Sequence, residues 1–186
     1  MPRWLTNSLL IAASFATALY LHLGFRDSNP DLTQVESIEQ TALGPSVQIE
    51  AFQLVGIQSR VTFDDSAQIE ALWQRFNDAT ALHASLDWSG LPTAIAYYDQ
   101  FDGNGNSATL MIGYPESSLT RPVDYPRHQV ESGAYLHWDL EGNSMEMVTQ
   151  TWNEVLAQIQ APRAVLERYG MDAWGQTTHI QIQALQ

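Results

Sequence analysis

Residues 47–76 read VQIEAFQLVGIQSRVTFDDSAQIEALWQRF, and this stretch predicts a β-strand followed by an α-helix. Apolar and polar residues alternate over residues 47–63, as in a half-buried strand, and Gly56 suggests a bend within that strand. The side chains at 64–66 (DDS) can cap a helix, because their oxygens accept hydrogen bonds from free backbone N–H groups. The apolar residues that follow recur at i, i+3, i+4 and i+7, and they are Ile69, Leu72, Trp73 and Phe76. A helix with such a stripe packs against a sheet.

Two further segments, residues 93–101 and 108–114, are rich in residues that favour strands. They are joined by residues 102–106 (DGNGN), a sequence suited to a tight turn. A β-hairpin therefore follows the helix, and the first half of the domain has the order βαββ.

The second half of the chain repeats this order. Residues 128–140 predict a strand interrupted by a glycine, and residues 178–185 alternate as a closing strand. Between them lies a second helical stripe, formed by Val148, Thr151, Trp152, Val155 and Ile159. The predicted fold class is α+β with duplicated βαββ modules. Such a duplication gives either two small sheets or one continuous antiparallel sheet, with two helices on one side and a ligand cleft between the halves.

The order of these motifs resembles the GyrI-like small-molecule-binding domain, also known as the effector-binding domain of multidrug-responsive transcription regulators. The similarity spans most of residues 47–186. It is carried by LVGI at 54–57, LWQRF at 72–76, AYYD at 96–99, GAY at 133–135 with Gly142, TW at 151–152, LERY at 166–169 and IQI at 180–182. The segment 166–169 looks like the Phe-Glu-x-Tyr element of that family. The resemblance implies the two-module fold and a small-molecule ligand.

The resemblance also implies a binding site in which Glu167 is the carboxylate that attracts lipophilic cations. A carboxylate among aromatic rings is partly desolvated, so it either takes up a proton or gains from a cation, to which each ring adds about 0.5–2 kcal/mol. The candidate ligand-binding residues are Glu167, Tyr97, Tyr98, Tyr135, Trp138 and Tyr169. Strand alternation allows only one of Tyr97 and Tyr98 to face the site.

The alternative is a purely structural role, in which Glu167 pairs with Arg163 or Arg168 at the surface and the aromatic residues belong to the core. Trp73 and Trp152 occupy equivalent positions on the two helical stripes, so we expect both to pack against the sheet rather than to contact a ligand.

The composition excludes several functions. The 186 residues carry 21 acidic and 8 basic side chains, a net charge of −13, which excludes nucleic acid as a partner. No cysteine is present, so thiolate catalysis and disulfides are excluded. The motif at 102–106 lacks the glycine and the final acid of a calcium loop, and the five histidines show no ligand spacing. We therefore expect no metal and no cofactor.

The first residues differ in character from the rest. Residues 1–25 predict a membrane anchor or a signal peptide, because the apolar stretch over 4–25 is long enough to cross a bilayer as a helix. Residues 26–46 predict a polar linker. The linker leads to the GyrI-like effector-binding domain at 47–186. The expected location is membrane-anchored, with an extracytoplasmic soluble domain that is secreted if the segment is cleaved.

Three functions remain compatible with these observations. The one we favour is a non-catalytic, membrane-tethered domain that binds hydrophobic, cationic small molecules as a sensor, scavenger or carrier. The second is a hydrolase of strained, cyclopropanoid electrophiles in which Glu167 acts as general acid or base. The third is a module that binds or inhibits a protein partner.

Overall fold

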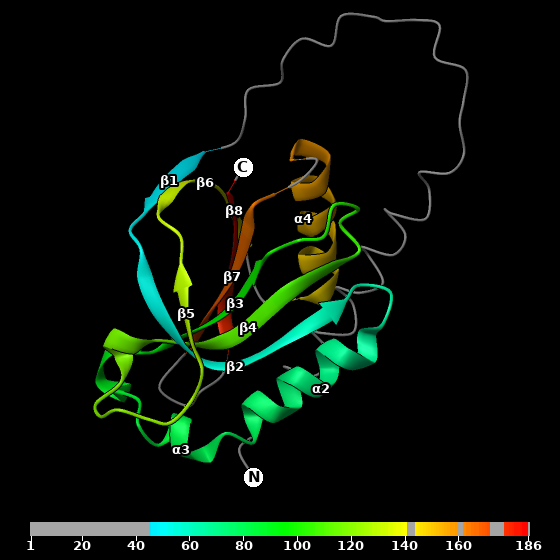
Figure 1. Cartoon of the computed structure of the whole chain (residues 1–186). Helices are drawn as coiled ribbons and strands as arrows, with labels where there is room; N and C mark the ends of the chain where they lie inside the picture. The colour runs from blue at the N-terminus through cyan, green and yellow to red at the C-terminus, as the bar shows by residue number, and fades with distance from the viewer. Residues whose placement is uncertain (1–44, 141–143, 160–161, 172–176, 186) are drawn as a thin grey trace, which may run out of the picture.

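One eight-stranded antiparallel sheet with helices on one face forms the protein (Figure 1). The structure is a computed structural model, and it describes residues 45–140, 144–159, 162–171 and 177–185. The sheet order is β1-β6-β8-β7-β3-β4-β2-β5. Of the two arrangements that the sequence left open, the continuous sheet is therefore the one that forms.

The elements follow the predicted duplication. The first module consists of β1 (Ser46–Ile49), β2 (Phe52–Thr62), α2 (Ser66–Asn77), β3 (Thr93–Asp99) and β4 (Ser107–Pro115). The second consists of β5 (Arg127–Val130), β6 (Gly133–Leu140), α4 (Met145–Gln158), β7 (Ala164–Met171) and β8 (Thr177–Leu185). The connections contain α3 (Thr80–His83) and the 3-10 helices η2 (Trp88–Gly90) and η3 (Glu116–Ser118). Each module has a divided first strand, a long helix and a hairpin, so the predicted α+β fold of two βαββ modules is confirmed.

The positions of the strand breaks differ from the prediction. The first strand of each module is divided before its expected glycine, at residues 50–51 and 131–132. Gly56 lies inside β2, opposite Gly113 of β4, and a Cβ atom on Gly56 would sit 2.1 Å from the Ile112 carbonyl oxygen. Gly56 therefore permits two backbones to approach closely.

The sheet is strongly curled. β1 and β2 are separated by two residues in sequence, yet β1 pairs with β6 at one edge of the sheet, and β2 pairs with β4 and β5 near the other. His128 of β5 meets Asp99 of β3 at 2.7 Å, although β4 and β2 lie between these strands in the sheet order. Only a curled sheet brings these side chains together.

The two faces of the sheet have separate cores. On the face covered by α2 and α4, the helix-side core contains the buried stripes of both helices, including Trp73 and Trp152. On the other face, the opposite-face core contains Tyr97 and Tyr135. Neighbouring residues of a strand point to opposite faces, so this division decides which side chains can share a site.

Helix α2 begins at the cap that the sequence predicts, and α4 has a cap of the same kind. The Asp65 side chain accepts a hydrogen bond from the backbone N–H of Ala67 at the start of α2. At the start of α4, the Ser144 side chain accepts one from the N–H of Met147. Each cap satisfies a backbone N–H group that the first turn of the helix leaves free.

The predicted location requires a correction. Within the described ranges, no helix is both long enough and apolar enough to cross a membrane. A bilayer-spanning helix needs about 20 apolar residues. The stretch 4–25 expected to provide one, and most of the linker at 26–46, lie outside the described residues. The predicted membrane-anchored location is therefore not supported and is withdrawn.

Candidate functional site

Glu167 lies in the middle of the sheet, on the face covered by the helices. It is paired with Ala96 of β3 on one side and with Ile182 of β8 on the other. Its neighbours on β7 with the same orientation, Val165 and Tyr169, belong to the helix-side core. Only 2% of Glu167 is exposed, so an acidic side chain is buried in a largely apolar layer.

Three side chains donate hydrogen bonds to this buried carboxyl group. The Trp152 indole N–H donates to Oε1 at 2.6 Å. The Tyr169 hydroxyl donates to Oε2 at 2.6 Å, and the Tyr98 hydroxyl lies 3.4 Å from the same oxygen. These donors come from α4, β7 and β3, so the site needs elements of both modules.

Burial controls the ionisation of this cluster. It raises the pKa of Glu167 above the ordinary value, and the hydrogen bonds from Tyr169, Trp152 and Tyr98 lower it in part. Burial, and then the negative charge of Glu167, raise the pKa of Tyr98 and of Tyr169 well above the usual range. Both tyrosines therefore stay protonated and act as hydrogen-bond donors. The ionised form of Glu167 is not solvated by water.

No cation neutralises Glu167 within the part of the chain that the structure describes. Arg163 instead forms an ion pair with Glu131 at 2.6 Å. Arg168 donates to the Gln183 side chain at 2.9 Å. The alternative that pairs Glu167 with Arg163 or Arg168 at the surface is therefore wrong, because β7 buries Glu167 and turns the next residue to the other face.

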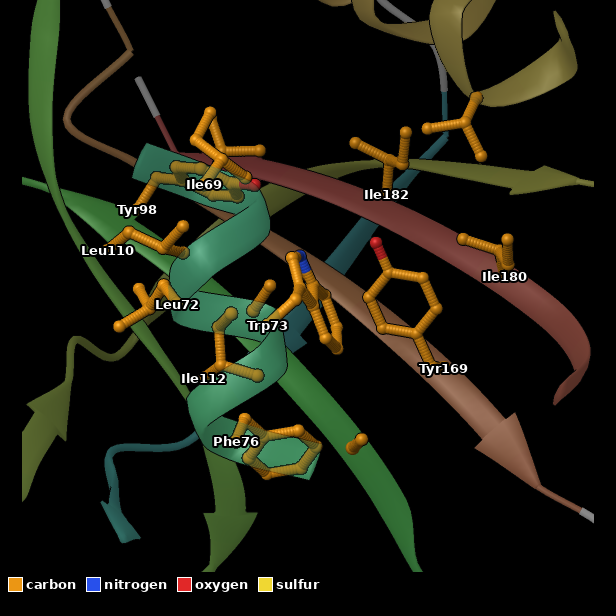
Figure 2. Close-up of a cluster of buried hydrophobic side chains, with 14 of the residues drawn as sticks. Ile69, Leu72, Trp73, Phe76, Tyr98, Leu110, Ile112, Tyr169, Ile180 and Ile182 are labelled. Carbon is orange, nitrogen blue, oxygen red and sulfur yellow. The ribbon is translucent and has the colours of Figure 1, made fainter. Parts of the chain in front are cut away.

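Aromatic rings surround the carboxyl group. The Trp73 ring of α2 stands edge-on to the Tyr169 ring, with centroids 5.2 Å apart. The Tyr98 and Trp152 rings meet in the same way at 5.5 Å. Figure 2 shows the Trp73 indole beside Tyr169, between α2 and the strand β8 that carries Ile180 and Ile182. We call Glu167, Tyr98, Trp152, Tyr169 and Trp73 the Glu167 cluster.

The predicted aromatic residues divide between the two faces. Tyr98 and Tyr169 join the Glu167 cluster, which answers the choice that alternation left open between Tyr97 and Tyr98. Tyr97 and Tyr135 lie in the opposite-face core, where their hydroxyl groups meet the backbone of Glu131. Trp138 is half-buried and packs against the helix-side core, on the strand position that pairs with Ile182.

The sequence predicted the core position of Trp152 but not its contact with Glu167. Trp152 is 1% exposed and packs in the core as predicted, but its indole N–H also binds the carboxyl group. The stripe on α4 showed that it faces the sheet, and a buried indole N–H needs an acceptor. The pattern did not reveal that the acceptor is Glu167, because nothing in it fixes which strand lies beneath the helix.

The fold and the family match together define the class of protein. A curled antiparallel sheet of two βαββ modules, with helices on one face, is the fold that the sequence resemblance implies. The chain belongs to the Cass2 family, described as integron-associated effector binding protein, whose model matches residues 47–174. The resemblance inferred from the sequence is thereby confirmed for the effector-binding domain.

Solved structures show the same fold. The integron cassette protein VCH_CASS2 from the mobile metagenome of Vibrio cholerae has a TM-score of 0.57 at 18% identity, covering 77% of this chain and 95% of that one. SAV2435, solved bound to tetraphenylphosphonium, has a TM-score of 0.57 at 19% identity, covering 75% of this chain and 91% of that one. A putative transcription regulation protein from Staphylococcus aureus MU50 has a TM-score of 0.52 at 20% identity, with coverages of 75% and 95%. No curated protein matches the sequence.

Proposed function

We propose that residues 47–186 bind hydrophobic, cationic small molecules at the Glu167 cluster, and that Glu167 supplies the negative charge that selects them. The observation that carries this proposal is the burial of Glu167 without a cationic partner among the described residues. Membership of an effector-binding family and the tetraphenylphosphonium bound to a protein of the same fold support it.

The energetics favour a cation over a neutral or anionic ligand. Removing a carboxylate from water is unfavourable, and the hydrogen bonds from Trp152, Tyr98 and Tyr169 offset this only in part, since the pKa of Glu167 remains raised. A lipophilic cation placed near Glu167 adds a Coulombic attraction that grows as water is excluded. The surrounding rings add cation–π contacts of about 0.5–2 kcal/mol each.

The selectivity follows from the chemistry of the donors. Tyr98, Tyr169 and Trp152 all direct hydrogen-bond donors toward Glu167. The cluster therefore has one acceptor group, the carboxyl group, surrounded by donors and by apolar surface. A strongly hydrated ammonium or metal ion would lose its water without gaining enough ligands. A delocalised cation with apolar substituents loses little hydration on entering such a site.

Three probes of similar shape and different charge test the proposal. Tetraphenylphosphonium is cationic, triphenylphosphine oxide is neutral and tetraphenylborate is anionic. Titration calorimetry with the full chain should show binding of the cation alone. Glu167→Gln should weaken that binding by about tenfold or more, the equivalent of about 1.4 kcal/mol.

The matched control is Glu116→Gln, which makes the same charge change at an exposed residue paired with Arg127. It should leave binding unchanged. Equal loss in the two variants would assign the preference to the overall negative charge of the protein. Equal binding of the cationic and neutral probes would contradict the role of Glu167.

A further inference from the structure

Asn77 is a buried residue whose whole side-chain amide lacks a hydrogen-bond partner among the described residues. It is the last residue of α2 and 6% exposed. Neither its side-chain oxygen nor its side-chain nitrogen has a hydrogen-bond partner within the described part of the chain. Buried amides without partners are rare in folded proteins, because each such group loses its bonds to water and gains nothing in return.

The geometry of the helix places Asn77 one turn from Trp73, which belongs to the Glu167 cluster. Asn77 follows Trp73 by four residues, so the two lie on the same side of α2, one turn apart. At about 100° per residue, Asn77 is about 40° further round the helix than Trp73, on the side away from Leu72. Figure 2 shows Leu72 beside Leu110 and Trp73 beside Tyr169, so the side of α2 that carries Trp73 is the one nearer to β7.

A chain of contacts connects this side of the helix to the carboxyl group. The Trp73 ring packs edge-on against Tyr169, and the Tyr169 hydroxyl donates to Glu167. A ligand that contacts Glu167 and these rings, and that extends along α2 toward its C-terminal end, would reach Asn77. The amide would offer it an NH2 donor group and a carbonyl acceptor.

We propose that Asn77 is a ligand-binding residue of this site, and that the preferred ligands are aromatic cations that also carry a carboxamide, lactam or similar donor–acceptor group. This inference rests on the proposed function and adds to it a second polar recognition point. Glu167 selects the charge of the ligand, and Asn77 selects the hydrogen-bonding group at its other end.

Two probes with the same shape separate these roles. Carbamoylmethyl-triphenylphosphonium and isobutyl-triphenylphosphonium have the same cation and side groups of the same size, but only the first can pair with an amide. Titration of the full chain should show tighter binding of the carboxamide probe. In Asn77→Leu that preference should fall by about tenfold, while the isobutyl probe keeps its affinity.

A structural role for Asn77 would give a different pattern. Asn77→Leu replaces an unpaired amide by an apolar side chain of the same size, so we expect its melting temperature to equal or exceed that of the native protein. Asn77→Ala provides a second variant if leucine does not fit. A preference for the carboxamide probe that survives in these variants, or its absence from the native protein, would overturn the inference and leave the proposed function intact. Failure of both probes to bind the native protein would reject both proposals.

Discussion

The two buried tryptophans on the helices allow the energy of one hydrogen bond in the site to be measured. Trp73 and Trp152 are 3% and 1% exposed, and each stands edge-on to a tyrosine of the Glu167 cluster. They differ in the hydrogen bonding of the indole N–H. Trp152 donates its indole N–H to Glu167 at 2.6 Å, whereas Trp73 makes no such bond to any described residue. Replacement by phenylalanine removes the same atoms from both residues. Only the replacement of Trp152 also removes a hydrogen bond to Glu167.

The expected free energies follow from this difference. Complete truncation of a buried tryptophan costs about 3–5 kcal/mol, and phenylalanine removes about a third of the side chain, so each variant loses about 1–1.5 kcal/mol through packing. Trp152→Phe also leaves a carboxyl oxygen without its donor, which costs about 1.5–3 kcal/mol if the group is charged. We therefore expect Trp152→Phe to be less stable than Trp73→Phe by about 1.5–3 kcal/mol.

Equilibrium unfolding in urea, followed by far-ultraviolet circular dichroism, measures both variants without relying on tryptophan fluorescence. The same comparison in a Glu167→Gln background completes a double-mutant cycle. If the two phenylalanine variants are equally stable at pH 7, the Trp152 N–H does not stabilise Glu167. If the difference persists without change in the Glu167→Gln background, its cause is packing, and the assignment of a functional hydrogen bond is refuted.

Three further comparisons test the site and the fold. Burial raises the pKa of Glu167 above its ordinary value of 4.5. The contribution of Glu167 to the free energy of unfolding is therefore complete below pH 4.5, and it is lost as the pH rises through the raised pKa of the folded state. Glu167→Gln should therefore gain stability relative to the native protein as pH rises, and urea titrations between about pH 4 and 8 that show a constant difference would contradict the shift. Tyr169→Phe removes a donor 2.6 Å from the carboxyl group and should cost about 1–3 kcal/mol in the same assay, whereas Tyr125→Phe, outside this cluster, should cost little. Gly56→Ala would place a Cβ atom 2.1 Å from a backbone oxygen and should cost at least about 2 kcal/mol, while Gly103→Ala, with nothing within 4 Å, should be tolerated; equal melting temperatures would show that β2 and β4 can separate.

The periodicity of the sequence was sufficient to predict the order of the elements. The stripe of α2 at Ile69, Leu72, Trp73 and Phe76 is buried as expected. The strand breaks were not predictable, because both alternation and a glycine are compatible with a continuous bent strand. The break at residues 50–51 separates β1, at one edge of the curled sheet, from β2, which lies next to the strand at the other edge, and this arrangement is a property of the whole fold.

The site was predictable in part. The acid and two of its tyrosines were in the candidate set, since their motif carries the family resemblance. Alternation could not choose between Tyr97 and Tyr98, because both faces of β3 are buried and both residues are large and apolar. The same difficulty concealed Asn77, whose position on the stripe of α2 gives no indication that its amide lacks a partner.

The register of β7 determines the charge of this site. Glu167 and Arg168 are adjacent, and they point to opposite faces of the sheet. A shift of one residue would place Arg168 under the helices, beside the tyrosines, and would reverse the charge that a ligand meets. The sequence of β7 does not fix this register, because residues on both of its faces are buried.

The register is fixed by the neighbouring strand. β8 alternates clearly, with Ile180, Ile182 and Ala184 buried on the helix side and glutamines between them, and Ile182 pairs directly with Glu167. A shift of β8 would bury Gln181 and Gln183 under the helices, which is far more costly than a shift of β7 alone. The acid that we propose to bind the ligand is therefore positioned by the apolar pattern of the strand beside it.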